Sequence, residues 1–224
     1  MSTTPARISP VHEVLEPYGP TWTHISDCAV ALHFAEPDAE RETMNTLALC
    51  DISALLKVGV KGPDIDAWLS GKNIDVPSAI YDTTALEGGG LVVRVSADEV
   101  LIESGIDTKS FDALDHDLVG ATPGTYRVDR QDATFLLSGN RSREVLAQTC
   151  GVNFAVAPAN KLVMTRVAVV SCSILPQPIG DLPVYRVWTD YTYAPYLWET
   201  LVEIIDELGG GVIGAQCHYP DIAS

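Results

Sequence analysis

The chain alternates between short runs typical of β-strands and longer stretches in which apolar residues have helical spacing. Strands are expected at residues 55–60, 91–95 and 100–103, which are rich in apolar and β-branched side chains. Helices are expected at residues 108–118 and 194–208, where apolar residues recur every three or four positions. Because helices are interleaved with hairpin-like strand pairs, the pattern predicts an α+β fold with antiparallel sheets.

One order of elements occurs twice. A strand ends at Gly62 and again at Gly139, and at the same spacing after each glycine two adjacent large apolar residues lie in a predicted helix. The repeat predicts two pseudo-repeated α+β halves. Further strands are expected at residues 23–34, 135–138, 164–174 and 184–189, and a further helix at 36–49. The expected segments are an extended N-terminal arm at residues 1–20, a first half at 21–125, a second half at 126–214 and a C-terminal tail at 215–224.

Charge excludes two classes of partner. The 224 residues carry a formal net charge of −16, with 14 basic against 30 acidic side chains. So acidic a surface repels nucleic-acid phosphates and anionic lipid headgroups, and neither nucleic acid nor a membrane is expected as a partner. The acidity is interpreted as a contribution to solubility, with steering of a cationic ligand or a basic partner protein as the alternative.

Targeting signals and metal motifs are also not predicted. The N-terminal sequence MSTTPARISPVHEV lacks the apolar core of a signal peptide, and the apolar runs are shorter than the ~20 residues of a membrane helix. The five cysteines and five histidines are dispersed, without CxxC, HxH or HExxH spacing, so no metal ligands are assigned. Scattered cysteines fit a reducing compartment, and a cytoplasmic location is expected.

Two glycine runs and one Cys–His neighbour pair are the remaining motifs. Residues 88–90 precede a strand and residues 209–211 follow a helix, whereas a phosphate-binding loop opens a helix. Cys217 stands beside His218, but the surrounding sequence has no nucleophile signature. No catalytic residue is therefore assigned.

Several segments occur in an order and spacing typical of one protein family. They read CDISALLKVGVKGPDIDAWLSG, IDVP and GGGLVVRVSADEVLIES, followed later by FLLSGNRSREVL and VYRVWTDYTYAPYLWETLVEII. These segments resemble the sarcosine oxidase gamma subunit, and the resemblance covers roughly residues 45–214. The family is similar to the folate-binding region of the glycine-cleavage T-protein, an aminomethyltransferase. The resemblance thus implies an aminomethyltransferase folate-binding-domain-like fold with a swapped pseudo-repeat.

The chain departs from the T-protein where that protein holds folate. The T-protein has an acidic pair in a GGxxDD-like pattern, and the matching stretch here places Val92 and Val93 at those positions. A T-protein stretch of the type YTGExGxE supplies a glutamate to the pterin, and residues 171–186 lack it. Valine offers neither a hydrogen-bond acceptor nor a general base. We therefore expect that this chain alone does not transfer one-carbon units to or from folate.

The leading hypothesis is a non-catalytic gamma-type subunit of a heteromeric sarcosine-oxidase-like complex that acts on an N-methyl amino acid. The resemblance implies alpha and beta subunits as partners, with the flavin in the partner subunits and no cofactor bound by this chain alone. The N-terminal arm and the C-terminal tail are candidate contact elements.

The alternative is a folate-dependent aminomethyl- or methyltransferase, with tetrahydrofolate as the ligand. Its candidate pocket residues are Asp51, Ser53, Arg94 and Tyr185. For Asp51 and Ser53, capping of backbone groups is the competing interpretation, because both residue types favour caps and turns. A stand-alone folate-fold protein with a different ligand is a third option that the sequence leaves open.

Overall fold

The computed structural model describes residues 7–119 and 123–223, which form two compact units. The first unit contains the chain up to Ala54, Asp132–Ala159 and the segment from Val163 onward, and the second contains Leu55–Gln131 and Asn160–Leu162. The expected α+β fold with antiparallel sheets is confirmed. The units are interleaved along the chain, because residues 21–54 fold with the C-terminal segments. They therefore do not coincide with the sequence segments 21–125 and 126–214.

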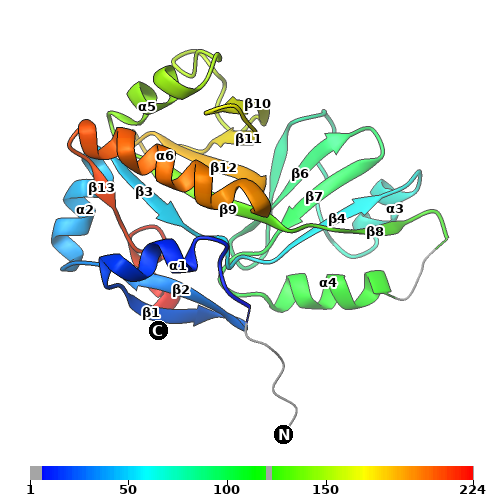
Figure 1. Ribbon diagram of the computed structural model, residues 1–224. Coiled ribbons are helices and arrows are strands. Elements are labelled where there is room, and N and C mark those ends of the chain that lie inside the picture. Colours follow the sequence, from blue (N-terminus) through cyan, green and yellow to red (C-terminus); the bar gives the residue numbers. More distant parts are fainter. Residues whose placement is uncertain (1–6, 120–122, 224) are drawn as a thin grey trace, which may run out of the picture. The chain divides into compact units, whose positions relative to one another are not determined.

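A six-stranded sheet forms the centre of the first unit (Figure 1). In spatial order its strands are β10 (Val163–Val167), β11 (Val170–Pro176), β12 (Val184–Asp190), β9 (Asp132–Ser138), β3 (Ala48–Asp51) and β13 (Gly211–Val212). Neighbouring strands are antiparallel except for the short β13, which pairs in parallel with β3. Because side chains alternate across a sheet, Phe135, Leu137, Tyr185 and Val187 share one face and belong to the apolar core of this unit.

Two helices contribute to this core. The helix predicted at residues 194–208 is confirmed as α6 (Ala194–Glu207), and its stripe of Leu197, Trp198, Leu201 and Ile205 is buried. The ring of Trp198 meets that of Phe135 edge-on, with 5.1 Å between the ring centroids. The shorter α5 (Ser142–Thr149) follows β9 and buries Val145 and Leu146.

Two segments expected as single strands are hairpins. Residues 23–34 contain the turn between β1 (Thr21–Ile25) and β2 (Cys28–His33), and residues 164–174 contain the turn between β10 and β11. The second turn consists of Ala168 and Val169, whose φ angles are both positive, at 46° and 66°. Glycine or asparagine usually occupies such positions and would have signalled the turn. Neither residue type is present, so the sequence did not indicate the turn, and the prediction of one continuous strand is wrong.

The terminal segments have regular structure where they are described. Residues 7–20, expected as an extended arm, include α1 (His12–Leu15) and the 3₁₀ turn η1 (Glu16–Tyr18), and Val11 and Leu15 are buried in the core. Residues 1–6 of that arm lie outside the described residues. The expected tail holds two 3₁₀ turns, η3 (Ala215–Cys217) and η4 (Pro220–Ala223). The helix α2 (Pro37–Thr46) completes the first unit.

The second unit has a five-stranded sheet that is antiparallel throughout. In spatial order its strands are β5 (Thr83–Leu86), β6 (Gly90–Ser96), β7 (Glu99–Glu103), β4 (Lys57–Lys61) and β8 (Tyr126–Asp129). The helices α3 (Ile65–Ser70) and α4 (Lys109–Val119) cover a core that includes Val58, Val60, Ile102, Phe111 and Leu114.

The two sheets repeat one strand order. The order β5-β6-β7-β4-β8 corresponds to β10-β11-β12-β9-β3, and a helix follows β4 and β9 in the chain. Gly62 and Gly139 end these two strands at positive φ, and a side chain at either position would collide with backbone atoms. In addition, β3 precedes β4 along the chain but pairs with β9, whereas β8 precedes β9 but pairs with β4. Each repeat therefore supplies its first strand to the other sheet.

Candidate functional site

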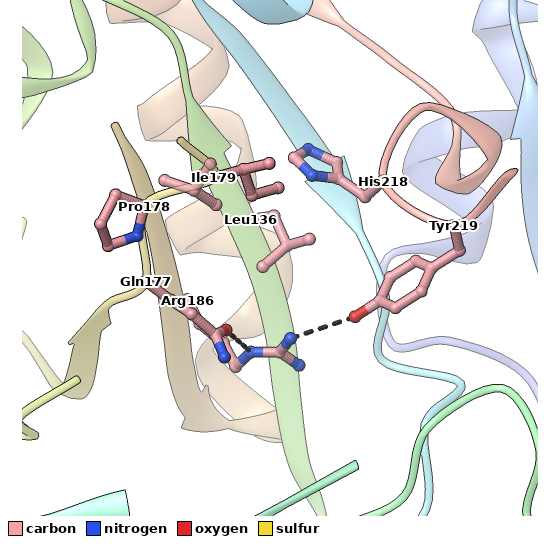
Figure 2. A pocket seen from close by; sticks show the side chains of 8 residues that line it. Leu136, Gln177, Pro178, Ile179, Arg186, His218 and Tyr219 are labelled. Atoms are coloured by element: carbon pink, nitrogen blue, oxygen red, sulfur yellow. Dashed lines mark hydrogen bonds between the residues drawn. The ribbon is translucent and has the colours of Figure 1, made fainter. Parts of the chain in front are cut away.

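A pocket of about 220 Å³ lies in the first unit, between the sheet and the C-terminal segment (Figure 2). Its lining comes from the strands β9 and β12, from the β11–β12 connection and from the residues that follow η3. The lining residues are Leu136, Gln177, Pro178, Ile179, Val184, Arg186, His218 and Tyr219. Half of these residues are apolar, and the other half carry hydrogen-bonding side chains.

Arg186 reaches the pocket because of strand alternation. It lies on β12 between Tyr185 and Val187, which point into the apolar core, so its own side chain points to the opposite face. Its Nε donates to Oε1 of Gln177 at 3.1 Å, and its Nη2 donates to the hydroxyl oxygen of Tyr219 at 3.1 Å. Figure 2 shows both bonds. The guanidinium, on a residue that is only 6% exposed, is therefore held in a defined position.

His218 brings a buried imidazole to the same pocket. Neither its Nδ1 nor its Nε2 has a hydrogen-bond partner among the described residues, although both atoms are buried. Burial, and then the positive charge of Arg186, lower the pKa of His218 from 6.5 to about 4. The imidazole is therefore neutral at pH 7, with one donor and one acceptor nitrogen.

The connection between β11 and β12 contributes three lining residues, Gln177, Pro178 and Ile179. The N–H of Gln177 donates to the carbonyl oxygen of Val184 at 2.8 Å, and Ile179 and Leu182 exchange backbone bonds of 3.0 and 3.1 Å. This ladder extends the hairpin and turns back at Gly180, whose φ is +59°. Gln177 and Ile179 are therefore positioned by backbone pairing.

Glu40 anchors the C-terminal side of the pocket. This carboxylate on α2 is 3% exposed, and its Oε2 accepts from the N–H of Gly214 at 3.1 Å and from the Cys217 thiol at 3.5 Å. Its Oε1 accepts from the N–H of Phe34 and from that of Ala35 at 3.0 Å. One buried carboxylate thus ties the end of β2 to the segment that carries His218 and Tyr219.

The cysteines of this region have little thiolate at neutral pH. Burial, and then Glu40, raise the pKa of Cys217 to about 12, and burial also raises the pKa of Cys50 well above its usual value. Cys217 donates to Glu40, and both nitrogens of His218 lack partners, so these sequence neighbours do not form a nucleophile–base pair.

Asp51 and Ser53, two of the sequence-based candidates, bind each other at the end of β3. Oδ1 of Asp51 accepts from the N–H of Ser53 at 3.0 Å and from its hydroxyl at 2.5 Å. The Ser53 hydroxyl oxygen in turn accepts from the N–H of Thr134 at 3.0 Å, which joins the turn to β9. This arrangement matches the capping interpretation, and a role in folate binding stays a prediction.

The other two candidates are also held by protein groups, and they lie in different units. In the second unit, Arg94 on β6 donates to the carbonyl oxygens of Pro77 and Ala97 and forms an ion pair with Asp66. In the first unit, the hydroxyl oxygen of Tyr185 accepts from Nε of Arg143 at 3.0 Å. Neither residue lines the pocket around Arg186.

Val92 and Val93, at the positions that the resemblance aligns with the T-protein acids, are fully buried in β6. The buried carboxylates of the described residues are Glu40, Asp51 and Glu103. Glu103 on β7 faces Lys57 on β4, with 3.6 Å between Oε2 and Nζ, and both side chains are almost completely buried. Each of the three carboxylates therefore has a partner within its own unit.

The polar residues of the pocket were not predicted as a group from the sequence. Arg186 is adjacent to the chosen Tyr185, and a cation within the apolar strand VYRVW is the signal that could have identified it. His218 was considered only as the sequence neighbour of Cys217. In residues 7–119 and 123–223, no group of three or more His, Cys, Asp or Glu side chains is arranged to hold a metal ion. Nor do those residues include a helix whose length and hydropathy would let it cross a membrane.

Comparison with protein-family models gives no match. Comparison with curated protein sequences gives none either. Among solved structures, the chain is similar to the glycine cleavage system aminomethyltransferase T from Bartonella henselae, with a TM-score of 0.75 and 13% identity over 95% of this chain. The chain spans only 60% of that protein's length. It is also similar to a chain of the heterotetrameric sarcosine oxidase from Corynebacterium sp. U-96, with a TM-score of 0.66 and 14% identity. That match covers 91% of this chain and 97% of the other. At these identities the similarity establishes the fold and no more.

Proposed function

We propose that this chain is a non-catalytic gamma-type subunit of a heteromeric, sarcosine-oxidase-like complex that acts on an N-methyl amino acid. The observation that carries the proposal is the extent of the structural match. The chain is similar to almost the whole length of one chain of a heterotetrameric sarcosine oxidase, at 97%, but spans only 60% of the aminomethyltransferase. A chain of this size therefore has a counterpart within a multi-subunit oxidase.

The contacts of the buried carboxylates support a non-catalytic role. Folate-dependent transfer needs an acid or a base that is available to the ligand. Glu40 accepts from three backbone N–H groups and a thiol, Asp51 accepts from Ser53, and Glu103 lies against Lys57. Releasing any of them would leave buried groups without partners, at about 1–3 kcal/mol for each group. These carboxylates stabilise the fold, and the oxidation would take place on flavin in alpha- and beta-type partner subunits.

The proposal is tested by purifying the affinity-tagged chain from the cells in which it occurs naturally. We expect it to elute from a sizing column together with flavin-bearing chains in a fixed ratio. The fraction should oxidise sarcosine or a related N-methyl amino acid, whereas the isolated chain should not. A chain that elutes as a stable monomer, and that does not associate with the flavin-bearing chains when they are mixed, would contradict the proposal.

The alternative, a folate-dependent aminomethyl- or methyltransferase, is favoured by the higher TM-score of 0.75 to the aminomethyltransferase. Isothermal titration of the isolated chain with tetrahydrofolate distinguishes the two functions. Micromolar binding together with one-carbon transfer would favour the transferase. Binding that is absent, or that occurs without transfer, agrees with the subunit proposal.

A further inference from the structure

Four exposed apolar side chains lie in or next to two turns of the first unit. Val169, in the two-residue turn between β10 and β11, is 79% exposed. Tyr191, Tyr193 and Tyr196 are 48%, 57% and 49% exposed. The first two tyrosines belong to the 3₁₀ turn η2 (Tyr191–Tyr193), and the third lies in the first turn of α6. Exposed apolar residues are ordinary when they are scattered, so their meaning depends on whether they are gathered.

The register of the sheet gathers these side chains at one end. β11 and β12 are antiparallel, with Cys172 near the start of β11 opposite Thr189 near the end of β12. The turn that precedes β11 and the turn η2 that follows β12 therefore lie at the same end of the sheet, where α6 also begins. We call the four residues Val169, Tyr191, Tyr193 and Tyr196 the apolar patch.

Val169 occupies its place in the patch at a cost to the free chain. Its φ of 66° is in the left-handed region, which a β-branched residue disfavours and which glycine or asparagine would adopt with less strain. The side chain is 79% exposed, so it gains little from packing within the chain. Backbone strain of this kind persists at functional sites. The valine therefore gains its packing only when another molecule covers it.

The surface beside the patch is acidic. Glu199 and Glu203 follow Tyr196 along the exposed face of α6, and Asp206 and Glu207 are exposed in its last turn. The helix contains no basic side chain, and none of the four acids forms an ion pair with a described residue. Like charges four residues apart, and acids near a helix C-terminus, both lower the stability of a helix. This face is thus also electrostatically unfavourable in the free chain.

The composition of this surface indicates the kind of molecule that covers it. Exposed aromatic side chains beside a charged rim are typical of protein–protein interfaces, in which tyrosine is enriched among the residues that contribute most binding energy. The acids of α6 need positive charges opposite them, and Lys and Arg side chains of a partner would relieve their mutual repulsion. A second copy of this chain would instead bring the same acids together, so self-association through this surface is disfavoured.

We propose that the apolar patch, with Glu199 and Glu203 on its rim, is the surface on which a flavin-bearing partner chain docks. The partner presents an apolar surface surrounded by Lys and Arg side chains. The identity of this partner rests on the proposed function, whereas the surface and the required chemistry of the partner come from the exposure, strain and charge of this chain's own residues.

The test measures the affinity of the isolated full-length chain for the purified flavin-bearing chains by surface plasmon resonance at low and high salt. Val169→Gly and Tyr193→Ser change the patch, and Glu203→Lys reverses a rim charge. Val169→Gly is the decisive variant, because it relieves strain and leaves the free chain at least as stable, so weaker binding cannot come from misfolding. The matched controls are Tyr126→Ser on β8, where the side chain is 62% exposed, and Glu42→Lys on the exposed side of α2.

We expect each of the three patch and rim variants to bind at least about tenfold more weakly than wild type at low salt. Salt should weaken the wild-type complex, and it should weaken the Glu203→Lys complex less. Both controls should bind within about twofold of wild type.

Three results would overturn the proposal. If the wild-type chain binds the flavin-bearing chains and Val169→Gly and Tyr193→Ser bind equally well, the docking surface is wrong and the proposed function stands. If the isolated chain forms a dimer that Tyr193→Ser abolishes, the patch is covered by a second copy. If the flavin-bearing chains do not bind the wild-type chain, the docking surface and the proposed function are both wrong.

Discussion

The buried ion pair of the second unit allows a quantitative test of how this fold is stabilised. Lys57 and Glu103 are register partners on β4 and β7, with 3.6 Å between Nζ and Oε2, and their side chains are 2% and 0% exposed. Nζ of Lys57 also donates to the carbonyl oxygen of Leu55 at 2.8 Å. With an effective dielectric constant of about 20, the attraction at this distance is about 5 kcal/mol, and the desolvation of both charges opposes it.

Removing one partner is therefore expected to destabilise the chain more than removing both. Lys57→Met or Glu103→Leu removes one partner of this buried ion pair and should lower the free energy of unfolding by about 3–5 kcal/mol. The double variant Lys57→Met/Glu103→Leu replaces the pair by apolar side chains of similar size and should cost less than either single change. The double-mutant cycle then gives the coupling between the two charges.

The same two strands provide a matched control. Lys61 and Glu99 are also register partners, at 3.5 Å, but the Lys61 side chain is 50% exposed. Lys61→Met should therefore cost less than about 1 kcal/mol.

Urea denaturation measures the free energies, and single variants of the buried pair should lower the midpoint by about 1–2 M. Amide hydrogen exchange in β4 and β7 should show that the loss is local to these strands. A cost for Lys57→Met no larger than that for Lys61→Met, or single effects in the buried pair that simply add, would contradict a strong coupling between the two buried charges.

Three further changes have definite expected outcomes. Glu40→Gln should lower the free energy of unfolding, measured in urea, by about 3 kcal/mol, because an amide nitrogen would face backbone N–H donors. The control Glu42→Gln, on the exposed side of α2, should leave that free energy unchanged. Equal effects of the two changes would contradict this role of Glu40. The folded-state pKa of His218, about 4, lies below its ordinary 6.5, so the unfolded chain binds the proton first and His218 lowers stability as the pH falls from 6.5 to 4. As the pH falls over that range, the free energy of unfolding of His218→Leu should rise relative to that of the wild type by up to about 3 kcal/mol. A difference that does not change with pH would show that the imidazole is not buried in its neutral form. Val169→Gly should raise the melting temperature and increase the free energy of unfolding by about 1 kcal/mol, because Val169 is 79% exposed and has a φ of 66°, which strains a β-branched residue. A lower melting temperature would exclude strain at this turn.

Local features of the fold could be predicted from the sequence because their causes are local. The apolar stripe of α6 follows from helical periodicity, and Gly62 and Gly139 mark strand ends at which the backbone has a positive φ. The two-residue turn at Ala168 and Val169 could not be predicted, because tertiary packing imposes a backbone conformation that these residues do not favour.

The α+β class, the repeat and the strand–glycine–helix order follow from the sequence alone, since each depends on neighbours along the chain. The pairing of β3 with β9 and of β8 with β4 is visible only in the folded chain, because strand pairing joins segments that are distant in sequence. The same holds for the pocket, where β12 presents Arg186 to a face on which the C-terminal segment places His218. Tyr185 and Arg186 are adjacent on β12, and one side chain lies in the core while the other lines the pocket. Which face of a strand becomes buried is determined by the elements that pack against it, and these come from distant parts of the sequence.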